Sequence, residues 1–228
     1  MNAPSASRRI AGVTVPLFSL YTERSWGLGE IGDLVEFTRW ATRSGVRLVQ
    51  LLPLGEIAGG ETSPYSALSA FGIDPLYISL ADVEDLPRDT WHDALKDDGV
   101  RTLDWVRAQS RIPYDAIRWL KERALHAAFD RFRANVQGHG SARAESFERF
   151  TREHAGWLED YALFRALKDA HARIAWWDWP ALLRDRDPAS LARARDEYQS
   201  SVLRYQYLQW LAHTQWANAR EGLRAMGV

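Results

Sequence analysis

Two short apolar segments, joined through one helical segment, do most to limit the folds open to this chain. Residues 11–20 (AGVTVPLFSL) and 47–55 (RLVQLLPLG) are rich in apolar and β-branched side chains, which predicts two buried strands. A strand, a helix and a second strand with short connections form a β-α-β unit, the building block of parallel sheets. We therefore expect an α/β fold, with the second strand covered on both faces because it is apolar almost throughout.

The segment between the two strands carries the start and stop signals of a helix. Asp33 is a favourable N-cap residue, and Glu36 follows it at the spacing of a capping box. Gly45 predicts the left-handed residue that ends the helix. The apolar residues that recur at helical spacing, and should share one face, are Leu34, Phe37, Trp40 and Ala41.

The stretch GLGEIG (27–32) matches the G-x-G-x-x-G pattern of dinucleotide-binding folds. In those folds the first glycine follows the strand directly, and an acidic residue closes the second strand. Here six residues separate Leu20 from Gly27, and Pro53 and Gly55 stand where the carboxylate belongs. We expect these glycines to shape a loop and we expect no cofactor. An NAD-dependent oxidoreductase is kept as a competing hypothesis.

Composition excludes several other classes of protein. The 29 basic and 30 acidic residues give a net charge of −1, which is not the basic footprint of a nucleic-acid-binding protein. Cysteine is absent, and the six histidines show no metal-ligand spacing, so no metal site is expected. No membrane segment or signal peptide is recognisable, which favours a cytoplasmic protein without a membrane partner. The eleven tryptophans fit either core packing or a carbohydrate site.

The chain changes character after about residue 86, where helical periodicity replaces strand-like runs. Two segments there show apolar faces at helical spacing: Ile117, Leu120, Ala124, Ala128 and Phe132 in the first, and Leu158, Tyr161, Phe164 and Leu167 in the second. Asp187 and Pro188 predict the start of one last helix that ends at Gly227. We therefore divide the chain into a disordered tail (1–9), a β-α-β unit with its loop (10–85), a helical insertion subdomain (86–188) and a closing helix (189–228).

Two parallel strands do not form a self-sufficient sheet with two covered faces. We expect the chain to be the front end of a larger repeating fold whose third strand begins at Val228. An unfinished sheet exposes a strand edge that can pair with another chain. The expected partners are therefore a C-terminal barrel portion or a second copy of the chain.

A long loop follows the second strand, at the edge where parallel sheets place their ligands. Its motifs are LPLG (52–55), SPY (63–65) and SAF (69–71). Together with WGLGEIGDL (26–34), WLEDYALFRALKDAHARIAWWDWP (157–180) and LQWLAHTQW (208–216), they resemble the amylomaltase or disproportionating-enzyme family of 4-α-glucanotransferases. The resemblance runs through nearly the whole chain from Arg9 and accounts for GLGEIG without a nucleotide.

The resemblance implies the N-terminal portion of a (β/α)₈ TIM-type barrel with a largely helical insertion subdomain. Such enzymes transfer α-1,4-glucan segments by retaining double displacement, which needs two carboxyl groups. In the family these come from later strands, so we expect no catalytic residue here and no activity from this chain alone. The implied substrate-binding residues are Ser63 and Tyr65, with Asp74 where the family usually has asparagine. The implied partner is a malto-oligosaccharide or α-glucan.

A non-catalytic malto-oligosaccharide-binding module, or one subunit of a split enzyme, is the alternative. It would keep the aromatic sugar platforms and carry out no chemistry.

Overall fold

A small parallel sheet stands at one end of a mostly helical molecule. The structure, a computed structural model, describes residues 9–138 and 140–228. Strands β1 (Ala11–Val15) and β2 (Val46–Leu51) pair in parallel, and helix α1 (Asp33–Arg43) connects them. The predicted β-α-β unit is therefore confirmed. Nearly all of the predicted disordered tail, residues 1–8, lies outside the described residues.

Both strands are shorter and more exposed than the sequence predicts. After Pro16 the chain turns into a short 3₁₀ helix, and β2 ends before Pro53. The expectation that β2 is covered on both faces is wrong. Alternate side chains of a strand point to opposite faces, and here Val49 packs against the main core while Leu48 is 51% exposed. In the described part of the chain, the apolar character of β2 is thus satisfied on one face only.

Helix α1 starts where predicted but with a different cap. Gly32 occupies the N-cap position, so the predicted capping box of Asp33 and Glu36 is wrong. The carboxylate of Asp33 instead turns back into the preceding loop, where it accepts hydrogen bonds from Ser25 Oγ, Thr22 Oγ1 and the Glu30 N–H, each at 2.7 Å. Trp40, expected on the apolar face, is 63% exposed. Gly45 adopts φ +83°, the predicted left-handed end of the helix.

The rest of the chain is helical. The helices are α2 (Trp91–Arg107), α3 (Tyr114–Asn135), α4 (Ala142–Glu153), α5 (Ala155–Ala170), α6 (Ala181–Arg184), α7 (Pro188–Glu197) and α8 (Gln199–Ala225). All five residues predicted to form the apolar face of α3 are buried, and so are Leu158, Tyr161 and Leu167 on α5. Periodicity predicted these helices because their apolar faces are buried: α3, Leu158 and Tyr161 face the main core, and Leu167 faces a small second core, against which the partly buried Phe164 also packs.

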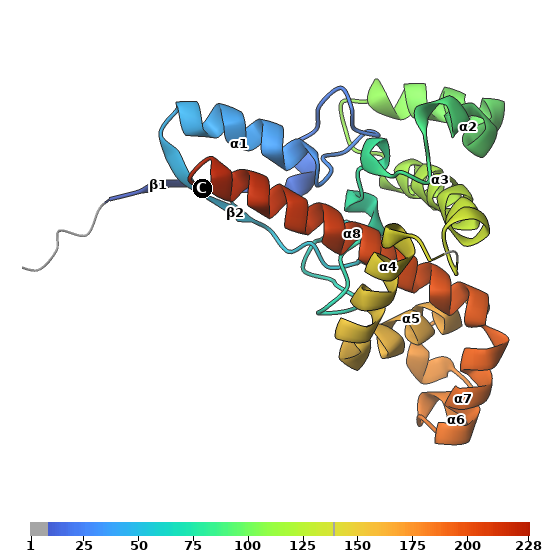
Figure 1. Cartoon of the computed structure of the whole chain (residues 1–228). Coiled ribbons are helices and arrows are strands. Elements are labelled where there is room, and N and C mark those ends of the chain that lie inside the picture. The colour runs from blue at the N-terminus through green and yellow to red at the C-terminus, as the bar shows by residue number, and fades with distance from the viewer. Residues whose placement is uncertain (1–8, 139) are drawn as a thin grey trace, which may run out of the picture.

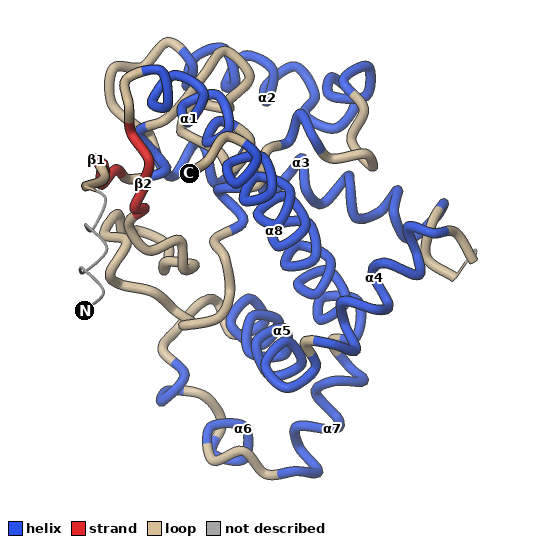
Figure 2. Tube along the Cα trace, turned by 60° about the vertical axis from the view of Figure 1, so that its left-hand side comes forward, coloured by secondary structure: helices blue, strands red, loops and turns tan. Residues whose placement is uncertain are grey.

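Helix α8 is 27 residues long and runs along the length of the molecule (Figure 1). Its C-terminal end lies beside α1 and the sheet, and its N-terminal end reaches the α5–α7 region, as the second view also shows (Figure 2). The single closing helix predicted from Asp187 is wrong, because the chain breaks at Tyr198 into α7 and α8. Asp187 caps α7 by accepting from the Ser190 N–H at 2.8 Å, as predicted. Gly227 (φ +77°) ends α8, also as predicted.

The main core includes residues of α8, α3 and α2, of the glycine-rich loop (27–32) and of the segment 76–83. It contains a buried ion pair. Lys121 and Glu30 are each 1% exposed, and Lys121 Nζ lies 2.7 Å from a carboxylate oxygen of Glu30. The same ammonium donates to the carbonyls of Leu76 and Ile78. This lysine therefore ties helix α3 to both loops. In the part of the chain that the structure describes, no helix combines the length and apolar character needed to cross a membrane.

The backbone N–H groups of the glycine-rich loop (27–32) are hydrogen-bonded to other parts of the chain. The N–H groups of Gly29, Ile31 and Gly32 donate to Phe18 O, Tyr77 O and Ser79 Oγ at 2.9, 2.9 and 2.7 Å. These are the kind of backbone donors that would cradle a phosphate in a dinucleotide fold. Because they are already used inside the protein, the loop serves packing, in agreement with the prediction.

Replacing Gly29 by alanine should destabilise the fold. A Cβ atom at Gly29 would lie 2.0 Å from the carbonyl oxygen of Leu17, a backbone atom that cannot move aside cheaply. We expect the free energy of unfolding to fall by about 2–3 kcal/mol or more, measured by urea denaturation followed through tryptophan fluorescence. Gly222→Ala on α8 is the matched control. Its nearest neighbour would be 3.6 Å away, so it should stabilise by about 0.5–1 kcal/mol. Equal effects of the two variants would contradict this account of the loop.

Candidate functional site

The loop between β2 and residue 74 is the candidate site, since it leaves the sheet at the carboxyl end of a parallel strand. It folds back on itself through two antiparallel bridges, Gly55 to Ile73 and Ile57 to Ala67. Within these bridges the Leu68 N–H donates to Glu56 O at 2.7 Å, and the Glu56 N–H donates to Gly72 O at 3.1 Å. The loop is therefore an ordered lobe, which we call the β2 lobe (residues 55–74).

The three predicted binding residues occupy two different places in the β2 lobe. Ser63 and Tyr65 lie together near its tip, where Ser63 Oγ accepts from the Tyr65 N–H at 3.3 Å and Tyr65 is 72% exposed. Asp74 is at the base and only 2% exposed. Its carboxylate accepts from the N–H groups of Leu76 and Ile57 at 2.9 and 3.3 Å. It also lies 3.6 Å from the Arg118 guanidinium.

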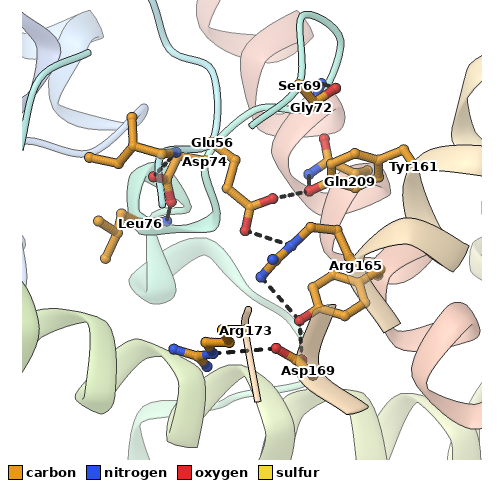
Figure 3. A network of polar contacts seen from close by, with 12 residues as sticks. Glu56, Ser69, Gly72, Asp74, Leu76, Tyr161, Arg165, Asp169, Arg173 and Gln209 are labelled. Atoms are coloured by element: carbon orange, nitrogen blue, oxygen red, sulfur yellow. Dashed lines mark hydrogen bonds and ion pairs between the residues drawn. The ribbon is translucent and has the colours of Figure 1, made fainter. Parts of the chain in front are cut away.

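A buried polar network holds the base of the β2 lobe against α5 (Figure 3). Glu56, 3% exposed, lies 3.0 Å from Arg165 Nε and accepts from the Tyr161 hydroxyl at 2.5 Å. On its other side Arg165 donates to the Tyr205 hydroxyl at 3.2 Å, and Tyr205 donates to Asp169. The Glu56 carboxylate is thus held by Tyr161 and Arg165, both on helix α5.

Helix α8 clamps the lobe and the segment after it through two glutamines. The Gln209 amide accepts from the Ile73 N–H and donates to the Ile73 carbonyl, both at 2.9 Å, and it also donates to the Tyr161 hydroxyl at 2.9 Å. Gln215 makes the same paired contact with Ser79, at 2.8 and 3.0 Å. Each glutamine replaces the neighbouring strand that would otherwise satisfy an isolated backbone segment.

Burial controls the electrostatics of this network. Desolvation raises the pKa of Glu56 to about 7, against the opposing pull of the Arg165 guanidinium. Burial also raises the pKa of Asp74, opposed first by Arg118. A cavity of about 220 Å³ borders the network and is lined in part by Glu56, Arg118 and Arg165. Within residues 9–138 and 140–228, no group of three or more His, Cys, Asp or Glu side chains could hold a metal ion. These buried charges are placed to position the lobe.

The outer face of the lobe presents aromatic rings. The ring of Phe71, 64% exposed, stacks on the indole of Trp157 with centroids 6.0 Å apart and planes inclined by 17°. The Trp157 indole N–H points to His154 Nδ1 at 3.4 Å. Tyr65 and Phe71 are thus two exposed aromatic rings of the β2 lobe, and such rings suit binding of a flat, partly apolar ligand.

Sequence reasoning missed the residues that anchor the lobe: Glu56, Arg118, Tyr161 (in its polar role), Arg165, Gln209 and Gln215. A signal was available for two of them. Arg165 falls four residues after Tyr161 on the apolar face of α5, and Gln209 falls four residues after Tyr205 on α8. A polar residue on an otherwise apolar helical face requires a buried partner. The identity of that partner was not visible in the local sequence.

Comparison with known proteins gives one consistent family. A family model described as 4-alpha-glucanotransferase matches residues 15–228. The 4-alpha-glucanotransferase of Thermus thermophilus is 33% identical over 204 residues, covering 89% of this chain and 38% of the relative. The Synechocystis 4-alpha-glucanotransferase is 31% identical over 219 residues, covering 93% and 40%. The chain thus spans about two fifths of the length of these curated relatives.

Solved structures share the fold. The amylomaltase from Streptococcus agalactiae in complex with acarbose superimposes with a TM-score of 0.75 at 22% identity, covering 97% of this chain and 42% of that one. The amylomaltase from Corynebacterium glutamicum gives a TM-score of 0.73 at 21% identity, covering 95% and 28%. The mixed, mostly helical fold with its small parallel sheet therefore matches part of the amylomaltase structures.

The raised pKa of Glu56 predicts a specific pH dependence of stability. The folded protein holds this proton up to about pH 7, and the ordinary value is 4.5. The stability that Glu56 contributes is therefore complete below about pH 4.5 and is lost as the pH rises through about 7, roughly 3 kcal/mol at most. Glu56→Gln cannot ionise, so its unfolding free energy should fall less between those pH values, measured by urea denaturation. Part of the fall should persist, since burial also raises the pKa of Glu30 to about 7.

Glu61→Gln, at an exposed position of the same lobe, is the matched control and should follow the unmodified chain. Identical pH dependence in the Glu56→Gln variant and the unmodified chain would contradict the assignment.

Proposed function

Because the chain belongs to the 4-alpha-glucanotransferase family, we propose that it forms the N-terminal portion of a (β/α)₈ barrel that transfers α-1,4-glucan segments. The parallel β1–β2 pair with its connecting helix α1 supports this, since it is the repeating unit of such barrels. Helices α2 to α6 lie in the proposed insertion subdomain (86–188), α7 follows it, and α8 leads back to the sheet. The single observation that carries the proposal is the β2 lobe, a rigidly clamped loop with exposed aromatic rings at the carboxyl end of a strand.

In this proposal the tip of the β2 lobe contacts the sugar. Tyr65 offers an aromatic face for a pyranose ring and a hydroxyl for hydrogen bonds, and Ser63 beside it is small enough to admit the ligand. The homologue from Streptococcus agalactiae is a complex with acarbose, which supports an α-glucan-like ligand for this chain.

Asp74 contributes to binding, in our proposal, from the base of the lobe. Its two carboxylate oxygens are occupied by the N–H groups of Ile57 and Leu76 and by Arg118. With 2% of its surface exposed, it acts by fixing the shape of the lobe that carries Ser63 and Tyr65.

The retaining reaction requires a nucleophilic carboxylate and an acid–base carboxyl group on opposite sides of the sugar. We propose that both come from barrel strands outside this chain. The exposed edges of β1 and β2 would then pair with further strands, either from a C-terminal barrel portion or from a second copy. A non-catalytic malto-oligosaccharide-binding module or a split-enzyme subunit is the alternative. It differs from a complete enzyme in that it binds the sugar without catalytic turnover.

The purified 228-residue chain should release no glucose from maltotriose. The reason is that the proposed catalytic carboxyl groups are not among its residues. Coupled glucose detection measures this, with the Thermus thermophilus relative as a positive control. Sustained glucose release in proportion to the concentration of this chain would refute the placement of the catalytic groups elsewhere.

Tyr65→Ala should weaken binding of maltotriose to the chain about tenfold, because the sugar loses its stacking surface. Isothermal titration calorimetry measures the affinity, and Tyr65→Phe, which keeps the ring, should retain most of it. Trp105→Ala is the matched control, an exposed aromatic residue (51%) on helix α2. Binding that survives in Tyr65→Ala at full strength would remove the β2 lobe as the sugar platform.

A further inference from the structure

The segment WWDWP (176–180) contributes a second aromatic surface that the β2 lobe does not use. Trp176 and Trp177 are 48% and 61% exposed, and we call them the tryptophan pair. Their rings lie 5.8 Å apart with planes inclined by 77°. Trp179, in contrast, is 6% exposed and belongs to a small second core with Leu163, Leu167 and Ala194. Two large apolar rings are thus held in solvent on a packed base.

The turn before the tryptophan pair is strained and firmly held. Ala172 and Arg173 adopt φ values of +50° and +61°, a left-handed conformation that residues other than glycine rarely take. Lys168 Nζ donates to the carbonyls of Arg173 and Ile174 at 2.9 and 2.8 Å. The Arg173 side chain lies 3.1 Å from Glu122 and 3.4 Å from Asp169. These contacts hold the backbone of the turn that leads into the tryptophan pair.

The same turn lies close to the β2 lobe. A Cβ atom placed on Gly59 would lie 4.0 Å from Arg173 Nη1, so the guanidinium borders the lobe backbone. Trp176 follows Arg173 by only three residues, a span of about 10 Å at full extension. The backbone of Trp176 therefore lies within about 10 Å of that of Arg173, and a long ligand seated on the lobe would have only this short span of chain to pass to reach the tryptophan pair.

A groove adjoins Trp176, and the ring of Trp177 lies next to that of Trp176 outside the groove lining. The groove encloses about 300 Å³, and its apolar walls include Trp176, Phe164 and Leu183. Its rim carries Asp160 and Arg186, which pair at 2.7 Å, and Arg184. Aromatic walls with planar charged groups at the rim suit a sugar, which offers apolar ring faces and hydroxyl groups along its edges. An α-1,4-linked chain curves, so rings inclined to each other fit it better than a flat platform would.

We propose that the tryptophan pair and this groove form an accessory α-glucan site that extends the β2 lobe and binds the longer part of a malto-oligosaccharide. The inference rests on the proposed function, since it takes the same ligand to contact Tyr65. It assigns a role to two exposed tryptophans that neither the core nor the lobe requires.

The test compares a short and a long ligand by isothermal titration calorimetry on the 228-residue chain. The unmodified chain should bind maltoheptaose more tightly than maltotriose. Trp177→Ala should weaken maltoheptaose binding about tenfold and leave maltotriose unchanged, while Trp177→Phe should restore most of the loss. Trp105→Ala is again the control for removing an exposed tryptophan. Because Trp177 is 61% exposed, its replacement should not change the unfolding midpoint, which is measured alongside.

The outcomes separate the two proposals. If Tyr65→Ala loses maltotriose and Trp177→Ala binds both sugars normally, the accessory site is overturned and the proposed function stands. If Trp177→Ala loses maltoheptaose while Tyr65→Ala binds normally, the accessory site stands without the lobe. An unmodified chain that binds neither sugar overturns both. If Trp177→Ala instead lowers self-association in sedimentation, with sugar affinity unchanged, the pair is a protein contact and the accessory site is overturned. Equal affinity for cellohexaose, a β-1,4-linked chain, would overturn the assignment to α-glucan.

Discussion

The β2 lobe and the segment that follows it depend on side chains that satisfy their backbone hydrogen bonds: Gln209 and Gln215 from helix α8, and Asp74 from the base of the lobe. An extended loop that leaves a sheet has N–H and C=O groups without ladder partners, and leaving them unsatisfied in the interior is costly. Gln209 and Gln215 each satisfy one residue on both sides, and Asp74 satisfies two more N–H groups. The two bridges within the lobe give it its own fold, and these side-chain contacts fix that fold against helix α8.

Ion pairs then join this lobe to the helical part of the molecule. Glu56 with Arg165, and Asp74 with Arg118, connect the loop to α5 and α3, while Lys121 connects α3 to the glycine-rich loop. Buried pairs are weak sources of net stability because desolvation offsets much of their attraction. Their use here fits a positional role. The pairs of Glu56 and Asp74 each join a lobe carboxylate to a side chain of a helix that packs in the main core. The position of the lobe is therefore set by the positions of α3 and α5.

The elements that the sequence predicted are those whose pattern is local. The β-α-β unit and the faces of α3 and α5 follow from apolar residues repeating every few positions, and Gly45 and Gly227 follow from the need for a positive φ angle. The failures concern features set by tertiary contacts. Asp33 prefers loop partners to a capping box, and the break at Tyr198 carries no proline or glycine to announce it. Gln209 and Ile73 are 136 residues apart, so their pairing could not be read from either segment.

The two glutamine clamps restrict how α8 can vary in length. Gln209 and Gln215 are six residues apart on one helix, which places them about 9 Å apart along its axis. Inserting or deleting a single residue between them would turn one amide by about 100° around the helix and away from its backbone partner. Natural length variation should therefore be excluded from this stretch of α8. Helix α8 thus fixes the spacing between Ile73 and Ser79.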